Sequence, residues 1–111
     1  MAISVGNTHL QTSKKASIDF NKINLIEAKT KIPLVLHGSS GIPVEQRKKL
    51  ARKTKVAKLN IGTEIRMTFG EALRKNLKNN PKTYDRLQLL KPTIKDLTKV
   101  TKKIIKQIGP N

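Results

Sequence analysis

Short apolar runs alternate with helical stretches along the 111 residues, and this alternation most constrains the fold. The expected strands cover residues 3–5, 32–36 and 56–61, and the expected helices cover residues 17–30, 43–53, 63–77 and 93–108. Strands that alternate with helices predict βαβ units, which build a parallel sheet with right-handed crossovers. The chain is therefore expected to adopt an α/β fold.

Individual residues support these strands and helices. The run at residues 32–36 is continuously apolar and ends at turn residues, as in a strand buried on both faces. Pro33 is compatible with it because proline fits the first residues of a strand. Ser17 is a suitable N-cap for the first helix, and Gly109 and Pro110 are expected to end the last one.

Polar and glycine-containing segments follow each expected strand, at residues 7–9, 37–41 and 60–63. Ligands bind at this carboxyl edge in barrels and open α/β sheets. Both histidines of the chain, His9 and His37, lie there on neighbouring turns. Neutral imidazoles on adjacent strand ends can share one metal ion. From spacing alone, two hydrogen-bonded loop histidines remain the simpler interpretation.

Two of these segments, residues 38–41 and 60–63, precede expected helices and contain glycine and hydroxyl side chains. Backbone N–H groups at such positions, together with the helix dipole, favour a phosphate group. Ordinary turns and N-caps use the same residue types. The spacing alone leaves both interpretations open.

The positive charge of the chain is compatible with a different function. Twenty-four Lys and Arg residues stand against seven Asp and Glu, a net charge of +17. Such an excess favours nucleic acid through counterion release. However, only five of the basic residues are Arg, whose planar guanidinium makes better bidentate contacts with phosphates and bases than Lys does. Only three aromatic residues are available for stacking. Nucleic-acid binding is therefore kept as the alternative, less favoured function.

The remaining composition bears on location. The chain has no cysteine, which excludes disulfides and thiolate metal sites. No segment approaches the ~20 apolar residues of a membrane helix, and the first residues do not resemble a signal peptide. We expect a cytoplasmic protein with no membrane partner.

Three segments carry a family resemblance, at residues 2–9 (AISVGNTH), 32–43 (IPLVLHGSSGIP) and 58–66 (KLNIGTEIR). In this order and spacing they resemble consecutive signatures of the class II aldolases that act on fructose and tagatose bisphosphates. The resemblance implies a partial TIM (β/α)8 barrel, made of the last three βα units plus a C-terminal helix. Residues 1–111 would then form one incomplete domain of such a barrel.

The resemblance also implies a chemistry. The family uses zinc to cleave a ketose bisphosphate reversibly into dihydroxyacetone phosphate and an aldehyde. His9 and His37 match two of its three zinc ligands. The positions that match the segments holding dihydroxyacetone phosphate are Gly38, Ser39, Ser40, Asn60, Ile61, Gly62 and Thr63.

Two departures from the family pattern matter. Leu10 stands where the family has glycine, so a side chain occupies a place where the backbone approaches phosphate. The chain also has no third histidine, and the strand that carries the family's catalytic aspartate has no counterpart, so no residue here is assigned as catalytic. We therefore expect the chain alone to be inactive. Its expected partners are the substrate and either a chain that carries the first barrel units or further copies of itself.

Overall fold

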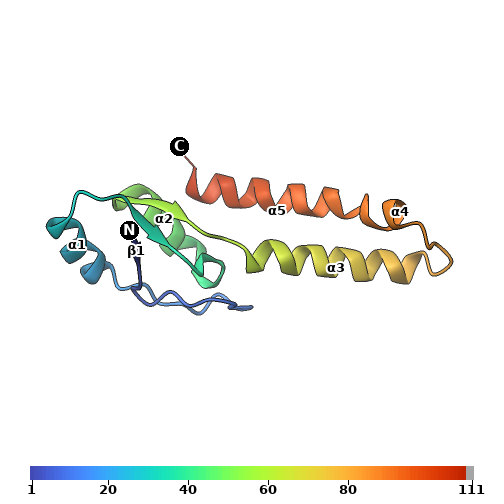
Figure 1. The fold of residues 1–111 in the computed structure, drawn as a ribbon, viewed down its shortest axis with the longest axis horizontal. Coiled ribbons are helices and arrows are strands. Elements are labelled where there is room, and N and C mark those ends of the chain that lie inside the picture. Colours follow the sequence, from blue (N-terminus) through green and yellow to red (C-terminus); the bar gives the residue numbers. More distant parts are fainter. Residues whose placement is uncertain (110–111) are drawn as a thin grey trace.

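The computed structural model of the chain describes residues 1–109 (Figure 1). Its elements are β1 (Ala2–Ile3), α1 (Phe20–Lys29), β2 (Leu34–Leu36), the 3-10 turn η1 (Ser39–Gly41), α2 (Val44–Lys53), β3 (Val56–Leu59), α3 (Thr63–Asn79), α4 (Arg86–Leu90) and α5 (Thr93–Ile108). The expected strands and helices occur in the expected order, with α4 as an additional helix. The structure also confirms an α/β fold with a parallel sheet.

The sheet has the order β1-β2-β3, and its two faces differ. Ile3, Leu36 and Leu59 are paired in register and lie on the face that packs into the core. The preceding register position of β2 carries Val35, which pairs with Ala2 and Lys58, both exposed. One face of the sheet is thus covered, whereas the other is largely bare.

The core lies between the sheet, α1 and α2. Its buried side chains are Val5, Ala16, Ile18, Ile23, Leu36, Ile42 and Leu50. Helix α2 contributes Leu50, and α1 contributes Ile23, both with no exposed surface. Burial of these apolar side chains stabilises the sheet region at roughly 25 cal/mol per Å².

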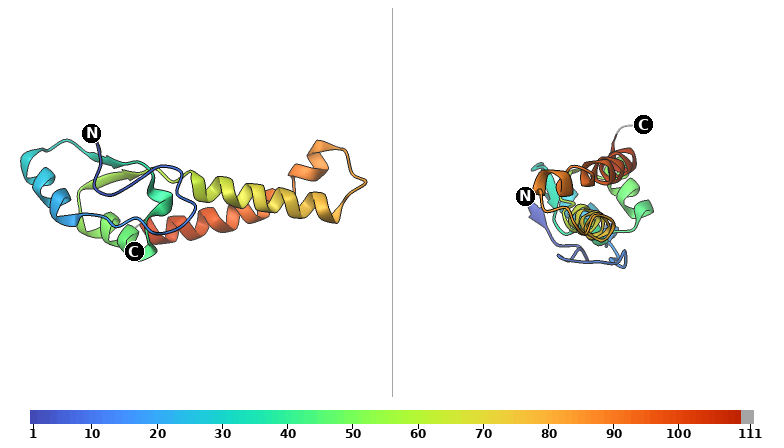
Figure 2. Two further views of the ribbon diagram at one scale, coloured as in Figure 1. Left: turned by 90° about the horizontal axis from the view of Figure 1, so that it is seen from below. Right: turned by 90° about the vertical axis from the view of Figure 1, so that its right-hand side faces the viewer.

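Helices α3 and α5 form a long hairpin that projects from the sheet region, with α4 at its far end (Figure 2). The molecule measures 59 × 26 × 22 Å. Its radius of gyration of 17.1 Å exceeds the value of roughly 13 Å for a compact chain of this length. The chain is therefore elongated, and much of the hairpin contacts no part of the sheet.

Several expected boundaries were wrong. The first helix begins at Phe20, because Asp19 rather than Ser17 is the N-cap: its Oδ1 accepts from the Lys22 N–H at 2.9 Å. Strand β1 covers Ala2–Ile3 rather than residues 3–5. The second and third strands are shorter than expected, and Ile32 is 57% exposed rather than buried. Helix α4 was not expected at all. Gly109 does cap α5, whereas Pro110 lies outside the described residues.

Within residues 1–109, no helix combines the length and apolar character that crossing a membrane requires.

Candidate functional site

A cavity of about 180 Å³ opens where the strands end. It is lined by His9, Leu10, His37, Gly38, Ser40, Asn60, Gly62, Thr63 and Arg66. Seven of the nine predicted site residues are brought together here. The other two do not line it: Ser39 is fully buried, and Ile61 is half-buried beside Asn60.

The two histidines face the same space. Their ring centroids are 5.6 Å apart, and the ring planes are tilted by 46°. Asn60 Nδ2 lies 3.1 Å from His37 Nδ1. This pair can form with the amide donating to an unprotonated Nδ1, or with the amide turned over so that its oxygen accepts from Nδ1–H. The second arrangement leaves Nε2 of His37 free of its proton and able to bind a metal.

These imidazoles fit one half of a zinc site. Two rings that share a zinc at about 2.0–2.1 Å have centroids roughly 5–6 Å apart, which the observed pair satisfies. Among residues 1–109, however, no three His, Cys, Asp or Glu side chains gather around a common point. A zinc in catalysis normally has three protein ligands and an open position. The described residues therefore offer two imidazoles to a metal ion, with no third His, Cys, Asp or Glu side chain beside them.

Leu10 has the backbone conformation of a glycine. Its φ is 58°, in the left-handed region that side chains with a Cβ disfavour. The Leu10 side chain is 75% exposed at the edge of the cavity. The turn thus has a geometry that glycine favours while carrying a bulky side chain.

The turn at residues 38–41 is held closely by the rest of the fold. Gly38 has φ 64°, and a Cβ at this position would clash with the carbonyl oxygen of Thr8. Ser39 Oγ donates to the Leu36 carbonyl at 3.1 Å, so this hydroxyl is used inside the fold. Ser40 Oγ accepts from the Glu64 N–H at 3.2 Å, and its own proton can still be donated. Ser40, rather than Ser39, presents its side chain to the cavity.

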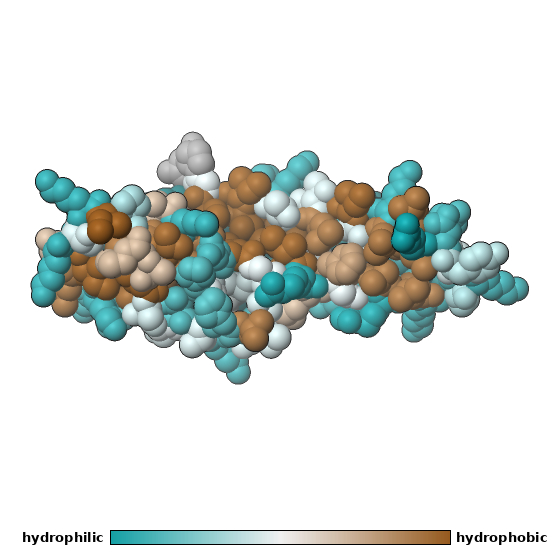
Figure 3. Space-filling view, in the orientation of Figure 1, coloured by the Kyte–Doolittle hydropathy of each residue, from teal (hydrophilic) through white to brown (hydrophobic). Residues whose placement is uncertain are grey.

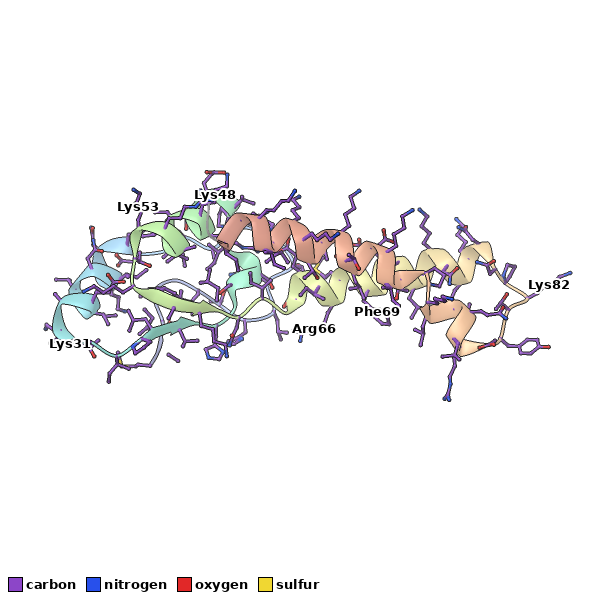
Figure 4. All side chains as sticks on the ribbon, turned by 90° about the horizontal axis from the view of Figure 1, so that it is seen from above. Lys31, Lys48, Lys53, Arg66, Phe69 and Lys82 are labelled. Atoms are coloured by element: carbon purple, nitrogen blue, oxygen red, sulfur yellow. The ribbon has the colours of Figure 1, made fainter. Side chains whose placement is uncertain are left out.

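Arg66 is a site residue that the sequence reasoning missed. It lies on the first turn of α3, at the junction of sheet and hairpin (Figure 4). Its Nη2 donates to Thr63 Oγ1 at 3.4 Å. A guanidinium beside a helix N-terminus adds the charge that a phosphate requires. The signal was present in the sequence, as a basic residue one turn after the 60–63 segment.

Glu64 lies behind the cavity and carries two ion pairs. Its Oε2 accepts from Lys14 Nζ at 3.0 Å and from Arg47 Nη2 at 2.6 Å. Burial acts to raise the pKa of Glu64, but the hydrogen bonds and charges of Arg47 and Lys14 outweigh it, so the pKa lies below its ordinary value of 4.5. Glu64 is therefore ionised at neutral pH, and its ion pairs join the loop between β1 and α1 to helix α2.

The cavity brings together two imidazoles, two hydroxyl side chains, glycine backbone and a guanidinium. Such a site can hold a metal ion next to a phosphate-bearing molecule.

Comparison with known proteins bears on this site. The model of the family described as fructose-bisphosphate aldolase class-II matches residues 1–111. The 6-phospho-5-dehydro-2-deoxy-D-gluconate aldolase of Shouchella clausii is 34% identical over 109 residues, and that of Bacillus licheniformis is 32% identical over 111. Each comparison covers 98% of this chain but 37% of the relative. The chain thus spans little more than a third of these relatives.

A solved structure is also similar. The YdjI aldolase from Escherichia coli K12 superposes with a TM-score of 0.71 at 27% sequence identity. The match covers 97% of this chain and 38% of that structure.

Proposed function

Because the chain belongs to the class II fructose-bisphosphate aldolase family, we propose that residues 1–111 supply one part of a zinc-dependent aldolase site. The observation that carries this proposal is the cavity that unites two imidazoles with the 38–40 and 60–63 segments at the strand ends. The reaction is the reversible aldol cleavage of a phosphorylated keto sugar, with dihydroxyacetone phosphate or a related keto fragment held by this chain.

The fold supports a role as a barrel segment. In a (β/α)8 barrel, helices cover the outer face of the strands, and the inner face points to the barrel axis. The sheet here has one covered and one bare face, and β1 and β3 are open edges. We propose that β1, β2 and β3 with their helices form the last three βα units of such a barrel, an incomplete domain.

His9 and His37 would hold the zinc. When bound, a zinc stabilises the negative charge that develops on the substrate's carbonyl oxygen. Asn60 lies 3.1 Å from His37 Nδ1 and lines the same cavity, and it would contact the substrate near its reacting carbons, as the family resemblance implies. The phosphate would be held by Gly38, Ser40 and Thr63. Ser39 would support the 38–41 turn, and Ile61 and Gly62 would shape the turn at residues 60–63.

The rest of the site must lie outside these residues. A third zinc ligand and a general acid/base would come from a longer polypeptide or from a second chain. We expect residues 1–111 alone to show no aldolase turnover, with values of ~1–10³ s⁻¹ being ordinary for enzymes. The gluconate-derived substrate in the names of two relatives makes a phosphorylated keto sugar acid a candidate beside a ketose bisphosphate.

Zinc binding by the purified chain tests the ligand assignment without relying on activity. Titration against a chromophoric chelator is expected to show weak binding, because two ligands are fewer than the usual three. His9→Ala and His37→Ala should each remove most of this binding. Asp96→Asn, on the remote helix α5, is the control and should leave it unchanged. Equal zinc affinity in all variants would contradict the assignment.

A second candidate function, nucleic-acid binding, has one observation in its favour. A groove of about 560 Å³ between α2 and α5 is lined by Val44, Lys48, Lys99, Lys102, Lys103, Lys106 and Gln107. Five lysines along one groove suit a phosphate backbone, although Lys48 also pairs with Glu45 at 3.0 Å. A salt titration of RNA and DNA binding tests it: affinity that falls steeply with salt and is lost in a Lys102→Ala/Lys103→Ala variant would favour this function.

A further inference from the structure

Arg47 is a buried charge that the proposed chemistry does not use. It projects from α2, has no exposed surface, and is the largest fully buried side chain in residues 1–109. A buried guanidinium is costly unless its donors are satisfied. Its position therefore has to be explained by its acceptors.

Those acceptors come from three different segments. Arg47 Nε donates to the Ser39 carbonyl at 3.1 Å, and Nη2 donates to the Ser40 carbonyl at 2.8 Å. The guanidinium also reaches Glu64 Oε2 at 2.6 Å and Gln107 Oε1 at 3.3 Å. The rigid fork of an arginine thus joins the 38–41 turn, the start of α3 and the end of α5.

The two carbonyl contacts fix how the turn presents its N–H groups. In a trans peptide the C=O and the following N–H point in opposite directions. When the Ser39 carbonyl faces Arg47, the N–H of Ser40 is directed away from α2. The Gly41 N–H is used by the Gly38 carbonyl at 3.4 Å, whereas the Ser40 N–H has no acceptor among residues 1–109. An unpaired donor is thereby left in the turn whose Gly38 and Ser40 line the cavity.

Glu64 closes the same network from the other side. Its carboxylate accepts from Arg47 and Lys14, and its backbone N–H donates to Ser40 Oγ at 3.2 Å. Lys14 belongs to the loop that also carries His9 and Leu10. Movement of Arg47 or Glu64 would therefore displace the turn, the first loop and the start of α3 together.

From these contacts we infer that Arg47, braced by Glu64, is a positioning residue that holds the 38–41 turn in its phosphate-accepting conformation. It acts from behind the turn and does not touch the ligand. This role rests on the proposed phosphate site and adds to it a residue on α2 and a connection to the end of α5.

Arg47→Lys is the most informative change. A lysine keeps the positive charge and can still reach Glu64, but one ammonium cannot bridge both turn carbonyls as the fork does. Leu50→Ala is the matched control. Leu50 is fully buried on the same helix, and its truncation destabilises the fold without removing a hydrogen bond to the turn.

The measurement is inorganic phosphate binding to the full chain, at a temperature where circular dichroism shows each variant folded. Amide resonances in ¹H–¹⁵N spectra report where the phosphate acts. In the wild type, phosphate should shift the Gly38 and Ser40 amides. Arg47→Lys should weaken binding about tenfold and abolish those shifts, whereas Leu50→Ala should retain both. Gln107→Met, which removes one acceptor of Arg47 remote from the turn, should weaken binding less.

The outcomes separate two failures. If the wild type binds phosphate and Arg47→Lys binds it equally well, or if Leu50→Ala weakens binding as much as Arg47→Lys does, the positioning role is wrong while the phosphate site stands. If Arg47→Lys does not fold, Gln107→Met with wild-type affinity and wild-type amide shifts overturns the role. If the wild type shows no phosphate shifts at all, the proposed function fails and this inference with it.

Discussion

The sheet region and the helical hairpin differ in how they are stabilised. Among residues 1–109, eight of the nine buried hydrophobic side chains lie between residues 5 and 50, and only Ile104 belongs to the hairpin. The hairpin instead exposes large apolar side chains, among them Phe69, Leu77, Leu87 and Ile94. Figure 3 shows brown apolar atoms along the hairpin and around α4.

This difference indicates which parts of the structure the chain can stabilise by itself and which parts it cannot. The turns that build the site sit on a buried core, and Arg47 and Glu64 link them to it. The hairpin has an amphipathic pattern whose apolar side is only partly covered by residues of this chain. We therefore expect the site turns to keep their shape in isolation better than the hairpin does.

Core truncation should show the largest contrast between the regions. Leu36→Ala removes a fully buried side chain and should lower the free energy of unfolding by about 2–5 kcal/mol. Leu87→Ala in α4, where the side chain is 70% exposed, should change it by less than ~0.5 kcal/mol. Urea denaturation followed by circular dichroism measures both. Similar losses from the two changes would mean that the hairpin has a core of its own.

Gly38→Ala should cause the next largest loss of stability. A residue with a Cβ at φ 64° costs about 1–3 kcal/mol, and the contact with the Thr8 carbonyl adds to this. Gly70→Ala is the control, because Gly70 lies inside α3 with an ordinary helical backbone, where alanine is preferred to glycine. Destabilisation of the same size by Gly70→Ala would remove the special role of the 38–41 turn.

Leu10→Gly, in contrast, should stabilise the fold. Relief of the left-handed strain at φ 58° is worth about 1–2 kcal/mol, and the greater freedom of glycine in the unfolded chain offsets part of it, leaving a gain of about 1 kcal/mol or less. The melting temperature should rise slightly. A lower melting temperature would show that the exposed Leu10 side chain makes a stabilising contact.

The pH dependence of Glu64 should be the smallest effect. Because its folded-state pKa is lowered, Glu64 stabilises the fold above pH 4.5, and this stability is lost as the pH falls through the folded-state value. Glu64→Gln should flatten that part of the stability profile. Glu45→Gln, at a side chain that is 82% exposed, should leave the profile as in the wild type. If Glu64→Gln loses stability at acid pH just as the wild type does, the ion-pair network does not stabilise the fold.

Much of the fold was predictable because it follows from short-range patterns. The apolar runs and the turn residues after them located all three strands, and the same turns located His9, His37 and the 60–63 segment at one edge. The helix start was missed because Ser17 and Asp19 are both good caps, and only the tertiary fold decides between them. Helix α4 is five residues long, too short for a periodic apolar pattern.

Two features of the site could not be predicted from local sequence. Arg47 lies in a helix of mostly charged residues, where it resembles the exposed Arg52 on the same helix. Its burial depends on acceptors up to sixty residues away, at Gln107. The burial of Arg47 thus depends on long-range contacts rather than on residue type. Leucine itself gives no signal for the positive φ of Leu10, and only the family resemblance, with its glycine at this position, pointed to it.

The central claim is that this chain carries a competent part of a class II aldolase site. Its most direct test is aldol cleavage of fructose 1,6-bisphosphate, with zinc, by this chain mixed or co-expressed with a separate polypeptide that holds the family's first five βα units. We predict turnover in the mixture that neither piece shows alone and that His37→Ala abolishes. Turnover only with Leu10→Gly would place the defect at that one position. No turnover with either form, when size-exclusion chromatography shows that the pieces associate, would contradict the claim.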